Sequence, residues 1–229
     1  MDGTLLNTEN LYTEAASDVL AQFGTGPLTW DVKIRLQGLP GIEATKIIIK
    51  EYEVPATPEE FMKLSMSVLE KKWHRSAFLP GALELLNYLE QKGIPMALGT
   101  SSNTINFQRK TNHLQHGFKH FGSHIVTGDD DRIGPGRGKP HPDIWHVCLN
   151  SINRERVEKG LNEIEMEDCL IFEDGVVGVL AGVAARAYVI WIPDKEALRL
   201  LAGKEKEIIA DSGEIILSLE NFDIKYLDL

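Results

Sequence analysis

The chain has 229 residues, of which 43% are hydrophobic and 25% are charged, and its net charge is −10. This composition is ordinary for a soluble globular protein of one domain, or of a core with a smaller insert. Nucleic acids and anionic membranes are not expected partners, because an acidic surface repels both. No apolar run approaches the roughly 20 residues of a membrane span, and no signal peptide is visible. The two cysteines, Cys148 and Cys169, form no paired motif, so we expect a reducing compartment and a cytoplasmic location.

The first third of the chain is predicted to be helical. Apolar residues recur at helical spacing after Thr8, which is a candidate N-cap. Thr57 is followed by a proline and two glutamates, a pattern typical of a helix start. Four helices are expected at about 9–23, 30–36, 42–52 and 58–73.

Beyond residue 78, short apolar runs alternate with helical segments. The runs lie at 94–98, 125–126, 170–172 and 189–192, and the helices at 82–91, 103–114, 142–152 and 175–185. Short buried strands that alternate with helices predict an α/β fold with a doubly wound parallel sheet. We expect residues 1–8 and 79–229 to form this core and residues 9–78 to form a helical cap. In such folds, functional residues gather at the carboxyl ends of the strands.

Polar residues in four loops suit a phosphoryl group together with a hard cation. Mg²⁺ prefers a few carboxylates and keeps several waters. Backbone N–H groups at a helix start bind phosphate oxygens, and a lysine offsets their charge. Each loop alone is more often an ordinary turn or cap, so the prediction depends on their joint occurrence. The residues are Asp2 in the opening loop, Thr100 and Ser101 after the run at 94–98, Lys139 before a helix, and Glu173 and Asp174 after the run at 170–172.

These loops resemble the four motifs of haloacid dehalogenase-like hydrolases, and the helical insert resembles the small cap of that superfamily. The finer pattern of two segments, Trp30-Asp31-Val32-Lys33 and Thr127-Gly128-Asp129-Asp130, resembles the pseudouridine-5′-phosphatase branch. The resemblance implies a Rossmann-like core, Mg²⁺ as cofactor and a small phosphorylated metabolite as substrate. The four motifs are Asp2-Gly3-Thr4-Leu5-Leu6, Ala97-Leu98-Gly99-Thr100-Ser101-Ser102, Gly138-Lys139-Pro140-His141-Pro142-Asp143 and Phe172-Glu173-Asp174-Gly175.

The resemblance also implies a role for each residue. Asp2 would protonate the leaving oxygen and later activate water, while its backbone carbonyl binds Mg²⁺. An acid at this position favours phosphate-ester chemistry over carbon–halogen cleavage. The remaining roles are phosphate binding by Thr100 and the backbone of Ser101, charge pairing with the nucleophile and phosphate by Lys139, and Mg²⁺ binding by Asp174 directly and by Glu173 through water.

The family's nucleophilic aspartate would stand one position before Met1, and its first central strand would precede that aspartate. We therefore expect an N-terminally truncated chain that is inactive as written. Two alternatives stay open: a β-phosphoglucomutase-like phosphomutase, and a non-catalytic phosphate-binding pseudoenzyme. The cap residues that read the substrate are not evident, although the turn Gly38-Leu39-Pro40-Gly41 is a candidate edge.

Overall fold

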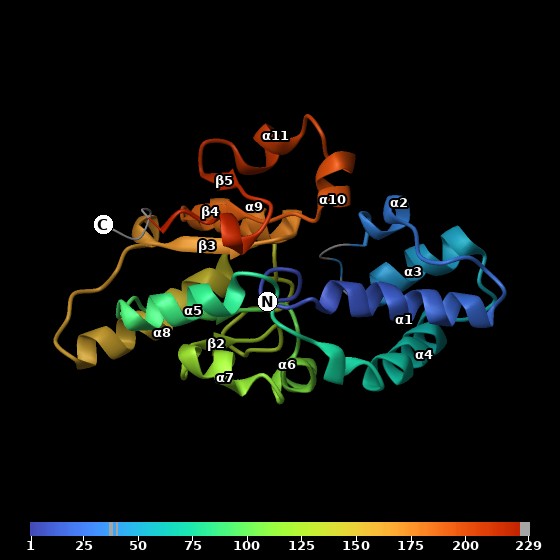
Figure 1. Cartoon of the computed structure of the whole chain (residues 1–229), viewed down its shortest axis with the longest axis horizontal. Helices are drawn as coiled ribbons and strands as arrows, with labels where there is room; N and C mark the ends of the chain where they lie inside the picture. Colours follow the sequence, from blue (N-terminus) through green and yellow to red (C-terminus); the bar gives the residue numbers. More distant parts are fainter. Residues whose placement is uncertain (37–38, 40, 225–229) are drawn as a thin grey trace.

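The computed structural model describes residues 1–36, 39 and 41–224 of the chain. A group of helices from the first third of the chain lies beside an α/β part formed by the rest, and the N-terminus lies where the two meet (Figure 1). Within the described residues, no helix is long and apolar enough to cross a membrane. The division into a core of 1–8 and 79–229 and a cap of 9–78 stays a prediction.

The helices of the predicted cap, called the cap helices below, are α1 (Thr8–Gln22), α2 (Trp30–Lys33), α3 (Gly41–Tyr52) and α4 (Pro58–Glu70), followed by the short 3₁₀ helix η1 (Trp73–Arg75). The predicted start of α4 is confirmed, because Thr57 and Glu60 form a reciprocal capping box. The prediction for Thr8 is wrong. Asn7 occupies the N-cap position, and the Thr8 hydroxyl instead donates to the Asp2 carboxylate.

The cap helices have an apolar core of their own. Phe61 of α4 is only 1% exposed and packs with Ile48 of α3 and with Val19 and Leu20 of α1. This cluster is separate from the two clusters of the α/β part. Burying aliphatic and aromatic side chains in this way stabilises the helix group, at roughly 1.5–3 kcal/mol for each fully buried side chain.

Among the residues that the structure describes, the α/β part contains two parallel sheets. In the first, β1 (Leu98–Gly99) pairs with β2 (Ile125–Val126). In the second, β3 (Leu170–Glu173) pairs with β4 (Tyr188–Trp191), which pairs with β5 (Gly213–Ile215). The helices are α5 (Ala82–Gln91), α6 (Thr104–Thr111), α7 (Gln115–Phe118), α8 (Asp143–Glu158), α9 (Val176–Ala185), α10 (Lys195–Leu200) and α11 (Glu205–Ile209). The parallel α/β architecture is confirmed, although β1 is shorter than the run at 94–98 and β5 was not predicted.

Strand β4 shows how the sheet is covered on both faces. Val189 and Trp191 point into the cluster that includes residues of α8 and α9, whereas Ile190 belongs to the cluster that includes residues of α5. Successive side chains of a strand point to opposite faces, so a strand buried on both sides must be apolar throughout. This explains why the run at 189–192 is continuous rather than alternating.

An apolar groove separates the two sheets. Its volume is about 390 Å³, and residues of both β1 and β3 line it, among them Leu98 and Phe172. Met1, which is 6% exposed, lines this groove and also the larger pocket beside it. The opening loop of the chain is thereby held at the carboxyl ends of the strands.

Candidate active site

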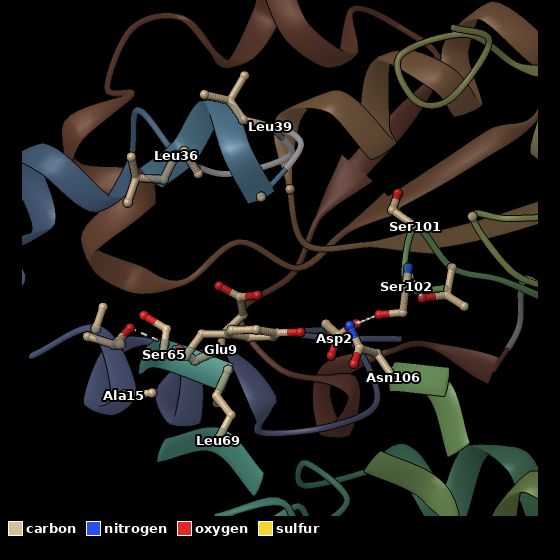
Figure 2. Close-up of a pocket in the computed structure, with 18 of the residues that line it drawn as sticks. Asp2, Glu9, Ala15, Leu36, Leu39, Ser65, Leu69, Ser101, Ser102 and Asn106 are labelled. Carbon is tan, nitrogen blue, oxygen red and sulfur yellow. Dashed lines mark hydrogen bonds between the residues drawn. The ribbon is translucent and has the colours of Figure 1, made fainter. Parts of the chain in front are cut away.

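The structure brings the predicted residues together in one pocket of about 580 Å³, whose walls come from the α/β part and from the cap helices. In Figure 2, the Asp2 and Ser102 side chains meet at one end of this pocket. The loops converge because the carboxyl ends of parallel strands meet at one edge of the fold. The predicted residues that line the pocket are Asp2, Thr100, Ser101, Lys139, Glu173 and Asp174.

The Asp2 carboxylate is held by three donors. The Thr8 hydroxyl donates to Oδ1 at 2.5 Å, the Lys110 ammonium donates to Oδ1 at 2.7 Å, and the Ser102 hydroxyl donates to Oδ2 at 2.9 Å. Burial alone would raise the pKa of Asp2, but the charges of Lys110 and of the Met1 ammonium, with the hydrogen bonds from Lys110 and Thr8, lower it to about 2. At neutral pH this side chain is therefore an oriented carboxylate.

Asp174 has the opposite environment. Burial raises the pKa of its carboxyl to about 8, and the nearby carboxylates of Glu173 and Glu9 add to the effect. One hydrogen bond, from the Thr4 hydroxyl at 3.1 Å, opposes it. The opening loop lies against this carboxyl, because a Cβ built on Gly3 would stand 2.1 Å from Asp174 Oδ2. Only glycine, which also has a positive φ of 68° here, allows that approach.

The crowding of carboxylates around Asp174 fits a hard cation. Within the part of the chain that the structure describes, no group of three His, Cys, Asp or Glu side chains is arranged to hold a metal ion. Mg²⁺ does not need such a group, since it is commonly bound by one or two carboxylates and keeps several waters. The Asp174 carboxylate offers oxygen ligands, and a cation would relieve the repulsion between it and the nearby carboxylates of Glu173 and Glu9.

Lys139 contacts this group of carboxylates through Glu173. Its ammonium pairs with the Glu173 carboxylate and donates to the Gly99 carbonyl at 3.3 Å. The Lys139 and Glu173 side chains are 8% and 7% exposed, so the pair is nearly dry. Helix α9 packs closely over Glu173, because a Cβ on Gly178 would come within 2.2 Å of the Glu173 carboxyl carbon. Glu173 and the Gly99 carbonyl thus fix the position of the Lys139 ammonium in the pocket.

The hydroxyl-rich loop joins β1 to α6. Thr100 is buried, and its hydroxyl accepts from the Ser102 N–H at 3.2 Å. Asn103 caps α6 by accepting from the Asn106 N–H at 2.9 Å. A tight hydroxyl turn that leads into a helix is a suitable cradle for phosphate oxygens.

Sequence reasoning missed Lys110, Ser102, Glu9 and the role of Thr8. Lys110 lies two turns after Asn103, on the same face of α6, and this periodicity was the available signal. An isolated lysine in a helix is usually solvated, so the pattern did not single it out. Its burial at 0% exposure depends on helices that are distant in sequence.

The cap helices supply the other wall of the pocket. Figure 2 shows Leu36 and Leu39 across the cavity from Glu9, Ser65 and Leu69. The predicted edge is supported for Leu39 and Gly41, which both line the pocket, whereas Gly38 and Pro40 lie outside the described residues. This wall is mainly aliphatic, with isolated polar groups.

A parallel α/β core, a group of helices beside it and a pocket of carboxylates, hydroxyls and a lysine between them are the features of a capped, Rossmann-like enzyme. The family model described as haloacid dehalogenase-like hydrolase matches residues 1–192. The chain is 50% identical to a probable pseudouridine-5′-phosphatase of Saccharomyces cerevisiae, over 98% of this chain and 92% of the relative. It is 32% identical to a (DL)-glycerol-3-phosphatase of Arabidopsis thaliana, over 85% of this chain and 77% of the relative.

A solved structure of a haloacid dehalogenase hydrolase from Entamoeba histolytica has the same fold, with a TM-score of 0.73 at 19% identity. The alignment covers 99% of this chain and 94% of that one. The chain therefore belongs to the haloacid dehalogenase-like hydrolases, and the resemblance of its four motifs is confirmed. Its named relatives support the class of phosphoric monoester hydrolase.

Proposed function

We propose that the protein is a Mg²⁺-dependent phosphatase that hydrolyses a small monoester of the nucleotide or sugar-phosphate class, similar to pseudouridine-5′-phosphate. One observation carries the proposal: the four motif loops line a single pocket with Asp2, Lys139 and Asp174. The 50% identity to a probable pseudouridine-5′-phosphatase supports the substrate class.

Asp174 and the backbone carbonyl of Asp2 would hold Mg²⁺ directly, and Glu173 would hold it through water. When bound, the cation would orient the phosphate and neutralise charge as the ester bond breaks. The Thr100 hydroxyl and the Ser101 backbone would bind phosphate oxygens. The Lys139 ammonium would donate both to Glu173 and to the phosphate, and this charge-assisted hydrogen bond would strengthen binding of the dianionic phosphate group.

Asp2 would move the protons. Hydrolysis of an ester needs a proton on the leaving alcohol, and later a base for the attacking water. The carboxylate form that Lys110 and Thr8 help to maintain suits the second of these steps, and the carboxylate would take up a proton from solvent before the first. The proposed route passes through an aspartyl-phosphate, whose nucleophile would be the family's first aspartate.

The cap helices would contact the leaving group, discriminate between substrates and exclude bulk water. The aliphatic wall of Leu36, Leu39 and Leu69 suits an apolar face, and Glu9 and Ser65 can bind hydroxyls. Such a surface fits a nucleoside or a sugar, and the Lys33 ammonium, 3.9 Å from the Glu9 carboxylate, also lines it. Cytoplasmic location and the absence of nucleic-acid and membrane partners stay predictions from composition.

The test is a screen of the protein, expressed from its complete reading frame, against a panel of phosphate monoesters. We expect orthophosphate release from pseudouridine-5′-phosphate or a related monoester with Mg²⁺, and its loss with EDTA. No release from any member of the panel would contradict the proposal. A phosphomutase would instead convert one sugar phosphate into its isomer without releasing orthophosphate.

A further inference from the structure

Lys110 is a buried cation that no motif explains. It lies in α6, its side chain is 0% exposed, and its ammonium is 2.7 Å from Asp2 Oδ1 and 2.8 Å from Ser102 Oγ. A buried charge is costly unless it is paired and hydrogen-bonded. The Lys110 ammonium can therefore stay buried only because the Asp2 carboxylate pairs with it.

Two aromatic rings from the cap side enclose the same ammonium. It lies 4.8 Å from the ring centroid of Tyr12 and 5.4 Å from that of Trp73, and these two rings pack edge to face. A cation over an aromatic face is attracted to it, most strongly where water is excluded. Tyr12 belongs to α1, where the chain leaves the α/β part, and Trp73 belongs to η1, where it returns.

The backbone of Lys110 is tied to the returning segment as well. The Ser76 hydroxyl donates to the Lys110 carbonyl at 2.6 Å, and the Ser76 carbonyl contacts His113 Nε2 at 2.8 Å. Ser76 follows η1 directly. Both ends of the lysine are thus fixed, with its ammonium directed at Asp2.

We propose that Lys110 is a positioning residue, whose caged ammonium fixes the direction of the Asp2 carboxylate at the junction of cap and core. This rests on the proposed function, in which Asp2 exchanges protons with the ester oxygen and with water. Proton transfer needs donor and acceptor in hydrogen-bond geometry, and a misplacement of about 1 Å costs up to about 100-fold in rate. A lysine that only joined cap to core would instead act on stability and on substrate affinity.

The experiment is a double-mutant cycle between Lys110→Met and Asp2→Asn in the protein expressed from its complete reading frame. For Lys110→Met alone we expect kcat to fall roughly 10- to 100-fold, with KM changed by less than about threefold. In the Asp2→Asn background the same substitution should cost less than about threefold more, because Lys110 would act only through that carboxylate. Lys110→Gln, whose amide can still donate to Asp2, should retain more of kcat than Lys110→Met.

Lys63→Met removes an exposed lysine of α4 and serves as the matched control, expected to leave kcat unchanged. Circular dichroism identifies any variant that fails to fold, and Lys110→Gln then replaces Lys110→Met in the cycle. Additive losses, or a rise in KM with kcat preserved, would overturn the positioning role while leaving the phosphatase assignment intact. A parent protein that releases no phosphate would overturn both.

Discussion

The two walls of the pocket offer a ligand different chemistry. The wall from the α/β part consists of short loops that carry Asp2, Lys139 and Asp174, whereas the wall from the cap helices is mainly aliphatic around Leu36 and Leu39. The difference separates two tasks. Charged loops at strand ends can activate a phosphoryl group common to all substrates, and a helical surface can discriminate between leaving groups.

The largest expected effect falls on the charged wall. Asp2→Asn should lower kcat by about 10²–10⁴-fold, because the amide cannot exchange the proton. Orthophosphate release at saturating substrate measures it, with the far-ultraviolet circular dichroism spectrum as a check on folding. A variant that keeps a rate within about threefold of the parent would show that Asp2 is not the acid and base.

The second effect compares an apolar cluster of the cap helices with one of the α/β part. Phe61→Ala should destabilise the cap helices by about 3–5 kcal/mol, because it opens a cavity at a side chain that is 1% exposed. We expect KM to rise as well, since Phe61 also lines the pocket. Leu86→Ala, in the cluster of the α/β part, is the matched control, with a cost of about 2–5 kcal/mol and an unchanged KM. Urea denaturation and steady-state kinetics measure the two quantities, and an equal rise of KM in both variants would contradict the division of tasks.

The third effect concerns the cation. Asp174→Asn should weaken Mg²⁺ binding by about 10- to 100-fold in isothermal titration calorimetry, in line with other losses from a metal site. Unchanged affinity would place the metal elsewhere.

In the protein without metal, Asp174 should make the free energy of unfolding depend on pH. The folded pKa of Asp174, about 8, lies above its ordinary value of 3.8, so the folded protein binds the extra proton between these limits. Metal-free stability should therefore fall as pH rises from about 4 to 8, and the slope should be smaller in Asp174→Asn. Urea midpoints at several pH values in EDTA measure this, and an equal slope in both proteins would count against the raised pKa.

The smallest effect is local to the cap helices. Thr57→Ala removes the side chain that accepts from the Glu60 N–H at 3.2 Å, and should cost about 0.5–2 kcal/mol of stability. Kinetic constants should not change, because Thr57 lies outside the pocket lining. A change in kcat larger than about threefold would show that the cap helices influence the chemistry beyond their contacts with the ligand.

The sequence predicted the charged wall better than the aliphatic one, for a physical reason. Asp174 and Lys139 lie in loops whose meeting follows from parallel topology, so local pattern and fold class suffice to bring them together. Leu36 and Leu39 become a wall only through the packing of α2 and α3, which periodicity alone does not determine. Lys110 is the extreme case, since only tertiary contacts bury it.

The predicted bounds of helices and strands were inaccurate for a similar reason, because they too depend on tertiary contacts. The run at 94–98 is apolar throughout, but only Leu98–Gly99 pairs with β2, because strand pairing depends on a partner that periodicity does not reveal. Strand β5 was missed because Gly213-Glu214-Ile215 contains a single apolar side chain. Thr8 fits the pattern of a cap, yet its hydroxyl is used by Asp2.

Calorimetric titration of inorganic phosphate into the 229-residue chain, with and without Mg²⁺, tests the central claim most directly, since it asks whether the convergent loops bind a phosphoryl group. We predict binding that Mg²⁺ strengthens and that Lys139→Met weakens by about tenfold or more, because a charge-assisted hydrogen bond is lost. Lys63→Met should bind like the parent. Equal phosphate affinity in Lys139→Met and the parent, or no binding with Mg²⁺ present, would contradict the account.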